Sequence, residues 1–530
     1  MSLQHPLHTH AQRLAKRLAK GQAPQLGEDL RFLLQDNPAW VMDSLKGLLE
    51  AREQPGAEGD WLVEAYSILL GQQLEFLRYG IDRSFQSSID LAHQFQHRVV
   101  GLARNGVLAP VLLSRLAVLL RDAKLQPIPE LFEAVSDLLN ESAPAEDFDP
   151  QAFQALLADL AKDVGDDPFE AARAITEITY AMPAEALAML ADIILSDPRS
   201  GLGETVPLML LDDRREARQG LARVLLQHAR ALSPIAMRRL IALRNWLPEN
   251  ERPPLDETVK AARRQGVVCA SWPDAGEVEI HASAVDGSGA QGFILLSKEK
   301  RKHTFSSILI RHGKGILDAW SQAGLSKRER DSMMDQMENE MPILRISRDY
   351  LDHAVQHQLA AVDGESVLPP IGLLQVAETI GASTWLPQRL ELDEGINRLL
   401  RELPPQWLEP AAIDQVLTHS AAWAERSGIT ESWFEDDQAV LDVLAATRSS
   451  SRTALASKVL AQFIQPRSLK WAERCLWTAL WCREGPRELR VFWPNFLLVA
   501  KALRDNHPLK SISLMSAIAE LSVEVALENR

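Results

Sequence analysis

Residues 278–312 read VEIHASAVDGSGAQGFILLSKEKRKHTFSSILIRH, and they decide the fold class because they alone carry the patterns of a β-sheet. Apolar and polar residues alternate over Val278–Val285, and an Asp-Gly type turn follows at Asp286–Gly289. Phe293–Leu296 and Thr304–Ile310 are apolar and rich in β-branched or aromatic residues. Three strands joined by two short turns predict a three-stranded antiparallel β-meander, which we place within residues 265–312.

On both sides of this β-rich stretch the sequence is helical. Leu, Ala and Ile recur at spacings of three and four residues, for example in Trp61–Phe76 and Arg215–Leu232. After the meander we expect helices over Lys314–Gln322, Lys327–Glu338 and Arg348–Ala361. The predicted fold is therefore mainly α: a multi-unit helical protein with solenoid-like stacked helix pairs and a small β-meander inserted near the middle.

The length of 530 residues exceeds what one hydrophobic core supports and predicts three or four packing units. The acidic segment Glu141–Asp149 marks one boundary, and eight of the thirteen tryptophans lie in the last 146 residues. We expect these tryptophans to form a core, with a binding groove as the alternative. The expected units are an N-terminal helical unit (1–140), helical pairs (150–264), the meander (265–312) and a Trp-rich helical unit (313–530).

An Ala-Arg pair recurs every 45 residues in the second unit, and an acidic residue precedes each arginine by six positions. The pairs are Ala172-Arg173, Ala217-Arg218 and Ala262-Arg263, and the acids are Asp167, Asp212 and Glu257. Paired-helix repeats have periods of roughly 40–47 residues. With its second-helix pattern over Asp213–Leu225, the stretch 165–264 resembles the HEAT-repeat family. The resemblance implies an α-solenoid in which each arginine bonds acids or carbonyls of the adjacent turn, and it implies no catalytic residues.

The net charge limits the classes of partner that the protein can bind, and the cysteine content indicates its compartment. A formal net charge of −15 argues against broad binding to nucleic acid or to an anionic membrane. The three cysteines form no disulfide framework, which fits a reducing compartment. The amino terminus lacks the apolar segment of a signal peptide, and no apolar run has the length of a membrane span. We expect a soluble, cytoplasmic protein that does not bind a membrane.

Positive charge nevertheless gathers around the second turn of the meander and after its third strand. The residues concerned are Lys298, Lys300, Arg301, Lys302, Arg311 and Lys314. Lys and Arg at a hairpin tip can pair with phosphates, so these residues are candidates for phosphate or nucleic-acid contact. The alternative is a solvated turn whose charges keep the sheet from pairing with other chains.

The segment Gly287–Gly292 matches the glycine-rich pattern GxGxxG and follows a strand. A strand follows it as well, so no helix N-terminus is available to hold a pyrophosphate. A glycine loop between two strands also covers nucleotide phosphates in protein kinases, but the other kinase motifs are missing from this sequence. A nucleotide site here is a minor alternative.

Asp349, His353 and His357 follow one another at intervals of four residues on a predicted helix. This spacing places them near one face, and a carboxylate with two imidazoles suits a divalent transition metal. Surface histidines on an ordinary helix explain the pattern equally well.

The sequence favours a non-enzymatic scaffold or adaptor that binds another protein along a helical-repeat surface. One alternative is a metal- or nucleotide-dependent enzyme centred on Asp349, His353 and His357 or on the Gly287–Gly292 loop. A second alternative is a nucleic-acid-associated factor that uses the basic turn 298–302. We assign no catalytic residue and no cofactor, and the sequence leaves the oligomeric state open.

Overall fold

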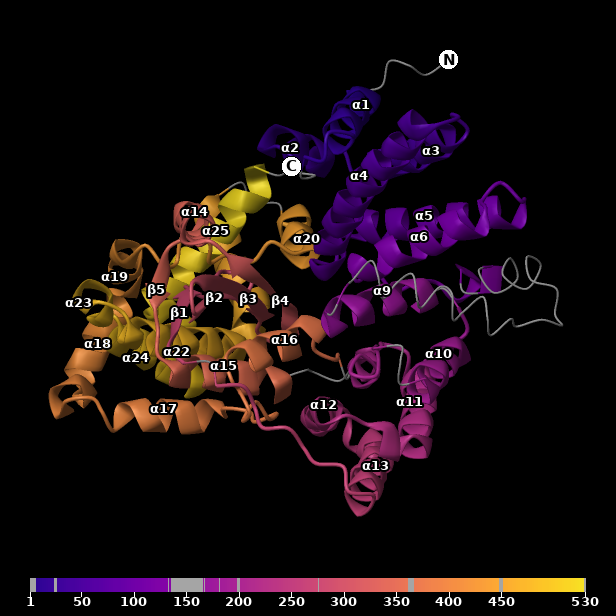
Figure 1. Cartoon of the computed structure of the whole chain (residues 1–530). Helices are drawn as coiled ribbons and strands as arrows, with labels where there is room; N and C mark the ends of the chain where they lie inside the picture. The colour runs from indigo at the N-terminus through magenta and orange to yellow at the C-terminus, as the bar shows by residue number, and fades with distance from the viewer. Residues whose placement is uncertain are drawn as a thin grey trace. The chain divides into compact units, whose positions relative to one another are not determined.

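The computed structural model confirms the predicted class: the fold is mainly α-helical, with a small antiparallel sheet in the middle of the chain (Figure 1). It describes residues 6–22, 26–131, 133–134, 165, 167–180, 182–197, 201–274, 276–360, 367–447 and 451–528. The boundary predicted at Glu141–Asp149 lies outside the described residues.

The chain divides into two compact units that are each interrupted in sequence. Unit 1 comprises residues 1–153, 175–186 and 437–439, and unit 2 comprises residues 154–174, 187–436 and 440–530. The meander and the Trp-rich helices belong to unit 2, so they share a compact unit with most of the helical pairs.

A single long helix organises unit 1. The helices are α1 (Pro6–Leu18), α2 (Glu28–Asp36), α3 (Trp40–Arg52), α4 (Ala57–Asp82), α5 (Gln86–Arg104) and α6 (Pro110–Asp122). The other five pack against α4, which buries Leu62, Leu69 and Leu70 at helical spacing. Helices α3 and α4 approach each other closely, and Gly47 lies directly against the ring of Tyr66.

A second group of helices precedes the sheet. They are α9 (Pro168–Tyr180), α10 (Ala184–Ser196), α11 (Arg215–Gln227), α12 (Pro234–Trp246) and α13 (Arg252–Arg264). The start of α12 shows how the sequence sets these boundaries: the Ser233 side chain accepts a hydrogen bond from the Ala236 amide, and Pro234 occupies the first turn.

The recurring Ala-Arg pairs do not occupy equivalent helical positions. Arg173 follows the first residue of its helix by five positions, Arg218 by three and Arg263 by eleven. Arg218 makes the expected turn contacts, since its Nη1 donates to the carbonyls of Asp212 and Asp213 at 2.8 and 2.9 Å. Arg173 instead pairs with Glu170 of its own helix and donates to Gln375, and Arg263 is exposed. The repeat resemblance therefore stays a prediction that rests on the stacking of helices.

The sheet has five strands, two more than predicted, in the order β4-β3-β2-β1-β5 with antiparallel pairing throughout. The strands are β1 (Val278–Ser283), β2 (Ala290–Glu299), β3 (Lys302–Arg311), β4 (Gly315–Leu325) and β5 (Ile343–Arg345). The first three correspond to the predicted meander. Strands β2 and β3 continue into the charged turn, which leaves only Lys300 and Arg301 between them.

The helix predicted over Lys314–Gln322 is wrong, because this segment is strand β4. Register shifts in its pairing with β3 lie between His303 and Phe305 and between Leu309 and Ile310. The second shift inserts one extra residue between Ile316 and Ala319, so both side chains are buried although an unbroken strand would point them to opposite faces. This β-bulge produces the spacing of three residues that resembles a helix.

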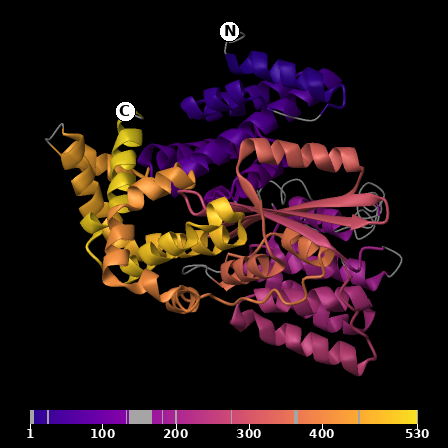
Figure 2. The same cartoon turned by 90° about the vertical axis from the view of Figure 1, so that its left-hand side faces the viewer.

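Helices cover both faces of the sheet (Figure 2). On one face α14 (Lys327–Glu340) packs three methionines against Ile294, Leu296 and Phe305. Residues of opposite parity, such as Phe293, face α15 (Arg348–Ala360), where Tyr350 lies 6.3 Å away between ring centroids. Helix α16 (Ile371–Thr379) approaches β4 so closely at Gly372 that only a glycine fits against the Ala319 carbonyl.

The remaining helices make up the C-terminal, tryptophan-rich part of the chain. They are α17 (Leu392–Leu400), α18 (Pro410–Thr418), α19 (Ser420–Ser427), α20 (Gln438–Ala446), α21 (Arg452–Val459), α22 (Ser468–Glu484), α23 (Arg487–Arg490), α24 (Trp493–Arg504) and α25 (Ser513–Glu528). Trp433, Trp471, Trp477 and Trp481 are at most 1% exposed. The indole N–H groups of Trp481 and Trp433 donate to the carbonyls of Ala282 and Val285, which ties α22 and the loop after α19 to the end of β1.

Among the described residues, no helix is both long and apolar enough to cross a membrane.

Candidate functional site

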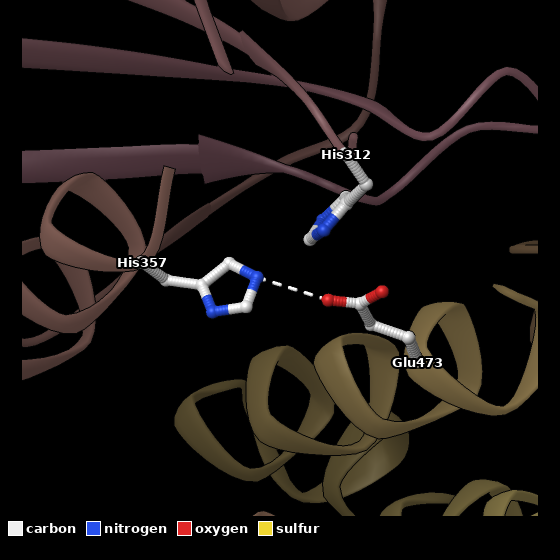
Figure 3. A group of neighbouring side chains, drawn as sticks. All are labelled: His312, His357 and Glu473. Atoms are coloured by element: carbon white, nitrogen blue, oxygen red, sulfur yellow. Dashed lines mark hydrogen bonds and ion pairs between the residues drawn. The ribbon is translucent and has the colours of Figure 1, made fainter. Parts of the chain in front are cut away.

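Three titratable side chains from distant parts of unit 2 meet beside the sheet (Figure 3). His312 follows β3, His357 lies on α15 and Glu473 lies on α22, and one nitrogen or oxygen of each lies within 4.8 Å of the others. The indole of Trp477 packs against both imidazoles, with ring centroids 5.6 Å from His312 and 5.1 Å from His357. We refer to His312, His357 and Glu473 as the His–His–Glu cluster.

The hydrogen bonds of His357 fix its tautomer. Its Nδ1 accepts from the backbone amide of Leu390 at 3.0 Å, so this nitrogen cannot carry a proton. The proton of the neutral ring must then lie on Nε2, which donates to Glu473 Oε1 at 2.9 Å. Both nitrogens of this buried side chain are therefore occupied, and neither offers a lone pair for proton abstraction.

His312 is the more isolated histidine of the cluster. Its Nδ1 lies 3.2 Å from the side-chain amide nitrogen of Gln358, while its Nε2 has no hydrogen-bond partner among the described residues. Burial lowers the pKa of His312 to about 3, and the neighbouring Glu473 carboxylate offsets only part of that shift. His312 is thus a neutral imidazole at physiological pH.

Glu473 carries the negative charge of the cluster. Burial by itself would raise the pKa of this carboxyl group, but the hydrogen bond from His357 and the positive charge of Arg389 bring the pKa below its ordinary value. Next to it, burial lowers the pKa of Arg474 to about 10, which still leaves the guanidinium protonated at neutral pH. That guanidinium lies 4.0 Å above the Trp471 ring, and its Nη1 has no partner among the described residues.

The cluster has the residue types of a divalent metal site, but its protonation pattern opposes one. A histidine that binds a metal through Nε2 must carry its proton on Nδ1, where His357 receives the Leu390 amide. Gln358 could reverse its amide to release His312, whereas a backbone amide cannot reverse. The arrangement is better suited to holding a half-buried carboxylate between β3, α15 and α22.

We therefore expect no tight zinc or cobalt binding at this cluster near neutral pH. Chelator-treated protein titrated with Co²⁺ should show no saturable visible absorption at one equivalent, and His312→Asn and Glu473→Gln should not change the titration. Stoichiometric Co²⁺ binding that both substitutions abolish would contradict the assignment of the His357 proton.

The metal ligands proposed from the sequence are not brought together. Asp349 and His353 are exposed, and the Nδ1 of His353 lies 2.6 Å from the Asp349 carbonyl of its own helix. Each step of four residues turns an α-helix by a net angle of about 40°, so His357 is rotated by about 80° from Asp349. That rotation carries His357 into the core, where it meets His312 and Glu473 instead.

The six basic residues singled out in the sequence separate into two groups at opposite ends of β3. Lys298, Lys300, Arg301 and Lys302 lie at the β2–β3 turn, where Lys302 Nζ donates to the Gly324 carbonyl at 2.9 Å. Arg311 and Lys314 lie at the other end, about 30 Å away along the ten-residue strand. Arg311 donates to the Ser288 carbonyl at 3.3 Å. The six residues therefore do not form one phosphate site.

The glycines of the Gly287–Gly292 loop pack against protein instead of forming a nucleotide cradle. A Cβ at Gly287 would lie 1.6 Å from the Ser432 carbonyl oxygen, and the Gly287 amide donates to the Ser432 hydroxyl at 3.1 Å. The Asp286 carboxylate accepts from the amides of Ser288 and Ala290, both at 2.8 Å. The backbone donors that would bind phosphate are thus already used within the protein.

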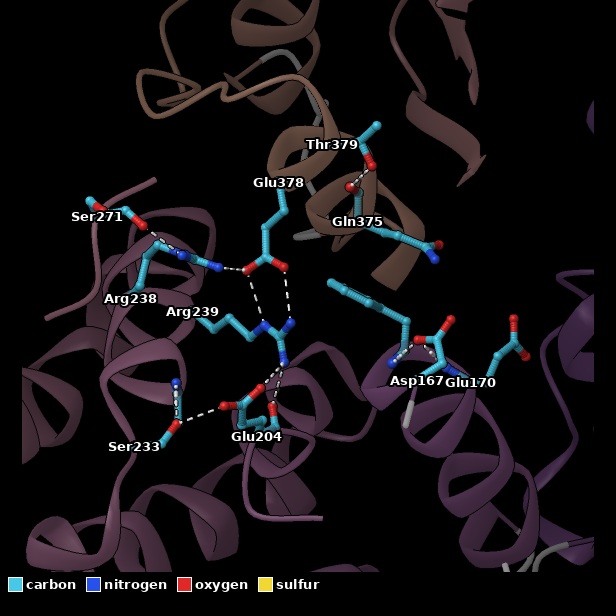
Figure 4. Close-up of polar contacts among 12 residues, drawn as sticks. Asp167, Glu170, Glu204, Ser233, Arg238, Arg239, Ser271, Gln375, Glu378 and Thr379 are labelled. Carbon is cyan, nitrogen blue, oxygen red and sulfur yellow. Dashed lines mark hydrogen bonds and ion pairs between the residues drawn. The ribbon is translucent and has the colours of Figure 1, made fainter. Parts of the chain in front are cut away.

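Sequence patterns missed a network of buried arginines that joins α12 to α16 (Figure 4). Glu378 accepts from Arg239 Nε and Nη2 at 3.0 and 2.9 Å and from Arg238 Nη2 at 2.8 Å. Arg239 also donates to the Glu204 carbonyl at 3.0 Å, and Arg238 to the Ser271 carbonyl at 2.7 Å. One carboxylate therefore bridges two guanidinium groups whose side chains are at most 8% exposed.

A pocket of about 270 Å³ opens between α11, α13 and the turns beside them. Its lining consists of Leu210, Arg218, Gln219, Ala222, Arg223, Leu247, Asn250, Glu251, Pro254 and Leu255. Arg218 forms one wall and is held by two hydrogen bonds to Glu251, at 2.7 and 2.8 Å.

Comparison with known proteins identifies two matching regions. Residues 183–266 match the Y4lR second domain, and residues 393–527 match the Y4lR C-terminal helical domain. The chain is similar to Y4lR proteins. It is 26% identical over 465 residues to the uncharacterized protein y4lR of Sinorhizobium fredii (strain NBRC 101917 / NGR234), and the alignment covers 86% of this chain and 87% of that protein. No solved structure gives a significant match. The pocket lies within the second-domain match, and Glu473 lies within the C-terminal match.

Proposed function

We propose that this chain is a non-enzymatic interaction scaffold that holds a partner protein at the pocket between α11 and α13. The observation that carries the proposal is the pocket between α11 and α13, which lies on the helical surface that the sequence favours for partner binding. The HEAT-like reading of these helices is part of the same proposal, because stacked helix pairs bind partners along such surfaces.

The size and lining of the pocket fit a side chain from a partner better than a small molecule. Ligand pockets usually have volumes of about 300–1,000 Å³, and this one is slightly smaller. Its floor is apolar at Leu210, Leu247 and Leu255, whereas Gln219 and Asn250 form an exposed polar rim. An apolar core inside a polar rim is the usual anatomy of a protein interface.

The pocket wall is also fixed before any partner arrives. The Arg218 side chain is only 8% exposed, and its donors are taken by Glu251 and by the carbonyls of Asp212 and Asp213. A wall that is already ordered loses little side-chain entropy on binding. The enzyme alternatives have weaker support, because the nitrogens of His357 and the amides of the glycine loop are already occupied.

Site-specific photo-crosslinking in the organism that makes the protein tests the proposal. A photoreactive residue at Gln219, on the pocket rim, should capture one discrete protein, whereas the same residue at exposed Lys260 of α13 should not.

A binding measurement with the purified chain and the captured partner tests the pocket itself. Ala222→Phe should fill the pocket and weaken binding by about 30-fold, as expected for a buried interface residue. Unchanged thermal unfolding of the variant would show that the fold is intact.

Two outcomes would overturn the scaffold proposal. One is that Gln219 and Lys260 capture the same set of proteins, which would indicate chance encounters. The other is a captured partner that binds the Ala222→Phe variant as tightly as the natural chain.

A further inference from the structure

The hairpin turn between β2 and β3 has a second basic segment beside it that the sequence did not connect with it. Strand β4 pairs with β3 so that Leu325 lies opposite His303, and α14 begins two residues after Leu325. Lys302 reaches the same place, since its ammonium group donates to the Gly324 carbonyl. The first turn of α14 therefore lies next to the hairpin turn.

This juxtaposition gathers seven cations at one end of the sheet, where β2, β3 and β4 meet their connecting turns. We define the basic surface as Lys298, Lys300, Arg301, Lys302, Lys327, Arg328 and Arg330. All except Arg330 are exposed. The segments 298–303 and 326–331 hold these seven cations and three acidic residues, a formal charge of +4 in a protein of net charge −15.

The pKa values of two neighbouring residues, His303 and Glu329, are affected by the cations of the basic surface. The pKa of His303 is lowered by burial and then by the positive charges of Arg330, Lys298 and Lys327. The pKa of Glu329 is lowered mainly by its hydrogen bonds to Ser326 and also by the charge of Lys302. Hairpin and helix cations therefore combine into one positive field.

The two acidic residues of α14 in this region are not buried, but both have local partners. Glu329 closes the capping box with Ser326, and Asp331 is paired with Arg330. The seven cations of the basic surface still outnumber the three acidic residues of the two segments.

The side chains around the basic surface indicate which polyanion it fits: single-stranded nucleic acid, an anionic membrane or duplex nucleic acid. Single-stranded nucleic acids need aromatic side chains on which bases stack, but Phe305 is 1% exposed and stacks on Trp320 beneath α14. Membrane docking combines cations with exposed apolar side chains. Among the described residues, neither the β2–β3 turn nor the first turn of α14 exposes a large apolar side chain. Regularly spaced phosphates alone suit such a surface.

We propose that the basic surface binds the phosphate backbone of duplex nucleic acid without reading its sequence. The proposal is independent of the pocket on α11–α13. The acidic remainder of the chain limits the affinity and confines the contact to this end of the sheet. Binding of this kind depends steeply on salt, because each neutralised phosphate releases condensed counterions.

Fluorescence anisotropy with a labelled 20-base-pair DNA tests the proposal on the full chain. Between four and seven phosphate contacts predict a slope of log affinity against log salt of about −4 to −6. Affinity should then fall by about 10²- to 10⁴-fold between 50 and 200 mM salt. Duplexes of unrelated sequence should bind equally well.

Variants of the two segments separate this proposal from general charge effects. Lys298→Gln/Lys300→Asn/Arg301→Gln should reduce the slope by about 3, and Lys327→Gln/Arg328→Gln by about 2. The matched control, Lys260→Gln/Arg263→Gln/Arg264→Gln, removes three exposed cations from α13 and should leave the slope unchanged. The φ of Lys300 is +54°, in the left-handed region. Asparagine is chosen as its replacement because asparagine tolerates this conformation.

Several results would overturn the inference. They are the absence of duplex binding at 50 mM salt, equal losses in the hairpin variant and the α13 control, and a slope that responds to only one of the two segments. Tighter binding to an unstructured single strand would indicate base stacking instead, and tighter binding to vesicles rich in phosphatidylserine would assign the surface to a membrane.

Discussion

Glu378→Gln is expected to lower the free energy of unfolding of unit 2 by about 3–5 kcal/mol. The carboxylate of Glu378 is the shared acceptor for Arg238 and Arg239, and all three side chains are at most 11% exposed. Glutamine keeps the size of the side chain but leaves two buried guanidinium groups without their counter-charge. Glu204 offsets only part of this loss, because its carboxylate lies 3.7 Å from Arg239.

Urea unfolding followed by tryptophan fluorescence measures this effect, since Trp246 and Trp385 belong to the same unit. Glu391→Gln is the matched control: Glu391 is 67% exposed and lies 3.9 Å from Arg389, so its loss should change stability by less than about 0.5 kcal/mol. In a double-mutant cycle, Arg239→Gln should recover part of the stability lost in Glu378→Gln. A loss below about 1 kcal/mol, or strict additivity of the two substitutions, would show that the pair is not energetically coupled.

The second large effect expected is acid destabilisation by His312. Its pKa is about 3 in the folded protein, compared with 6.5 for an ordinary histidine. Between these values the unfolded chain binds a proton that the folded protein does not, so stability falls as pH decreases through this window. The slope is about 1.4 kcal/mol per pH unit, which gives about 2 kcal/mol between pH 6.5 and pH 5.

His312→Asn should remove this part of the pH dependence, because asparagine does not titrate and can still bond to Gln358. Glu473, His357 and Arg474 face the same ring. The lowered pKa of Glu473 gives stability that is lost only as pH falls through that lowered value, below the window used here. Urea unfolding at pH 7 and pH 5 should therefore report the contribution of His312 to the pH dependence of stability and not that of Glu473.

Exposed His353 provides the control, since His353→Asn should leave the difference between pH 7 and pH 5 unchanged. An equal loss of stability in the natural chain and in His312→Asn would mean that other groups cause the acid sensitivity.

The first three strands could be predicted because their residues alternate and their turns carry glycine or charge. Strand β4 could not, since a β-bulge between Ile316 and Ala319 replaces the period of two with a spacing of three. Strand β5 has three residues, too few for any period to appear. In both cases pairing with a neighbouring strand, and not the local pattern, decided the conformation.

Each candidate site likewise combines residues that the sequence singled out with residues that only the fold brings beside them. The sequence singled out His357, but its partners His312 and Glu473 lie 45 and 116 residues away along the chain. It singled out the cations of the hairpin turn, but not Lys327 and Arg328, which become neighbours only through the pairing of β3 with β4.

By itself the sequence determined the mainly helical class, the position of the sheet and the charge of its turn, because periodicity and composition act over a few residues. Only the tertiary structure decided which face of α15 is buried, which carboxylate joins Arg238 to Arg239, and which cations gather at one end of the sheet. These are contacts between segments far apart in sequence. An arginine or histidine has the same letter whether it faces water or a buried glutamate, and packing alone distinguishes the two.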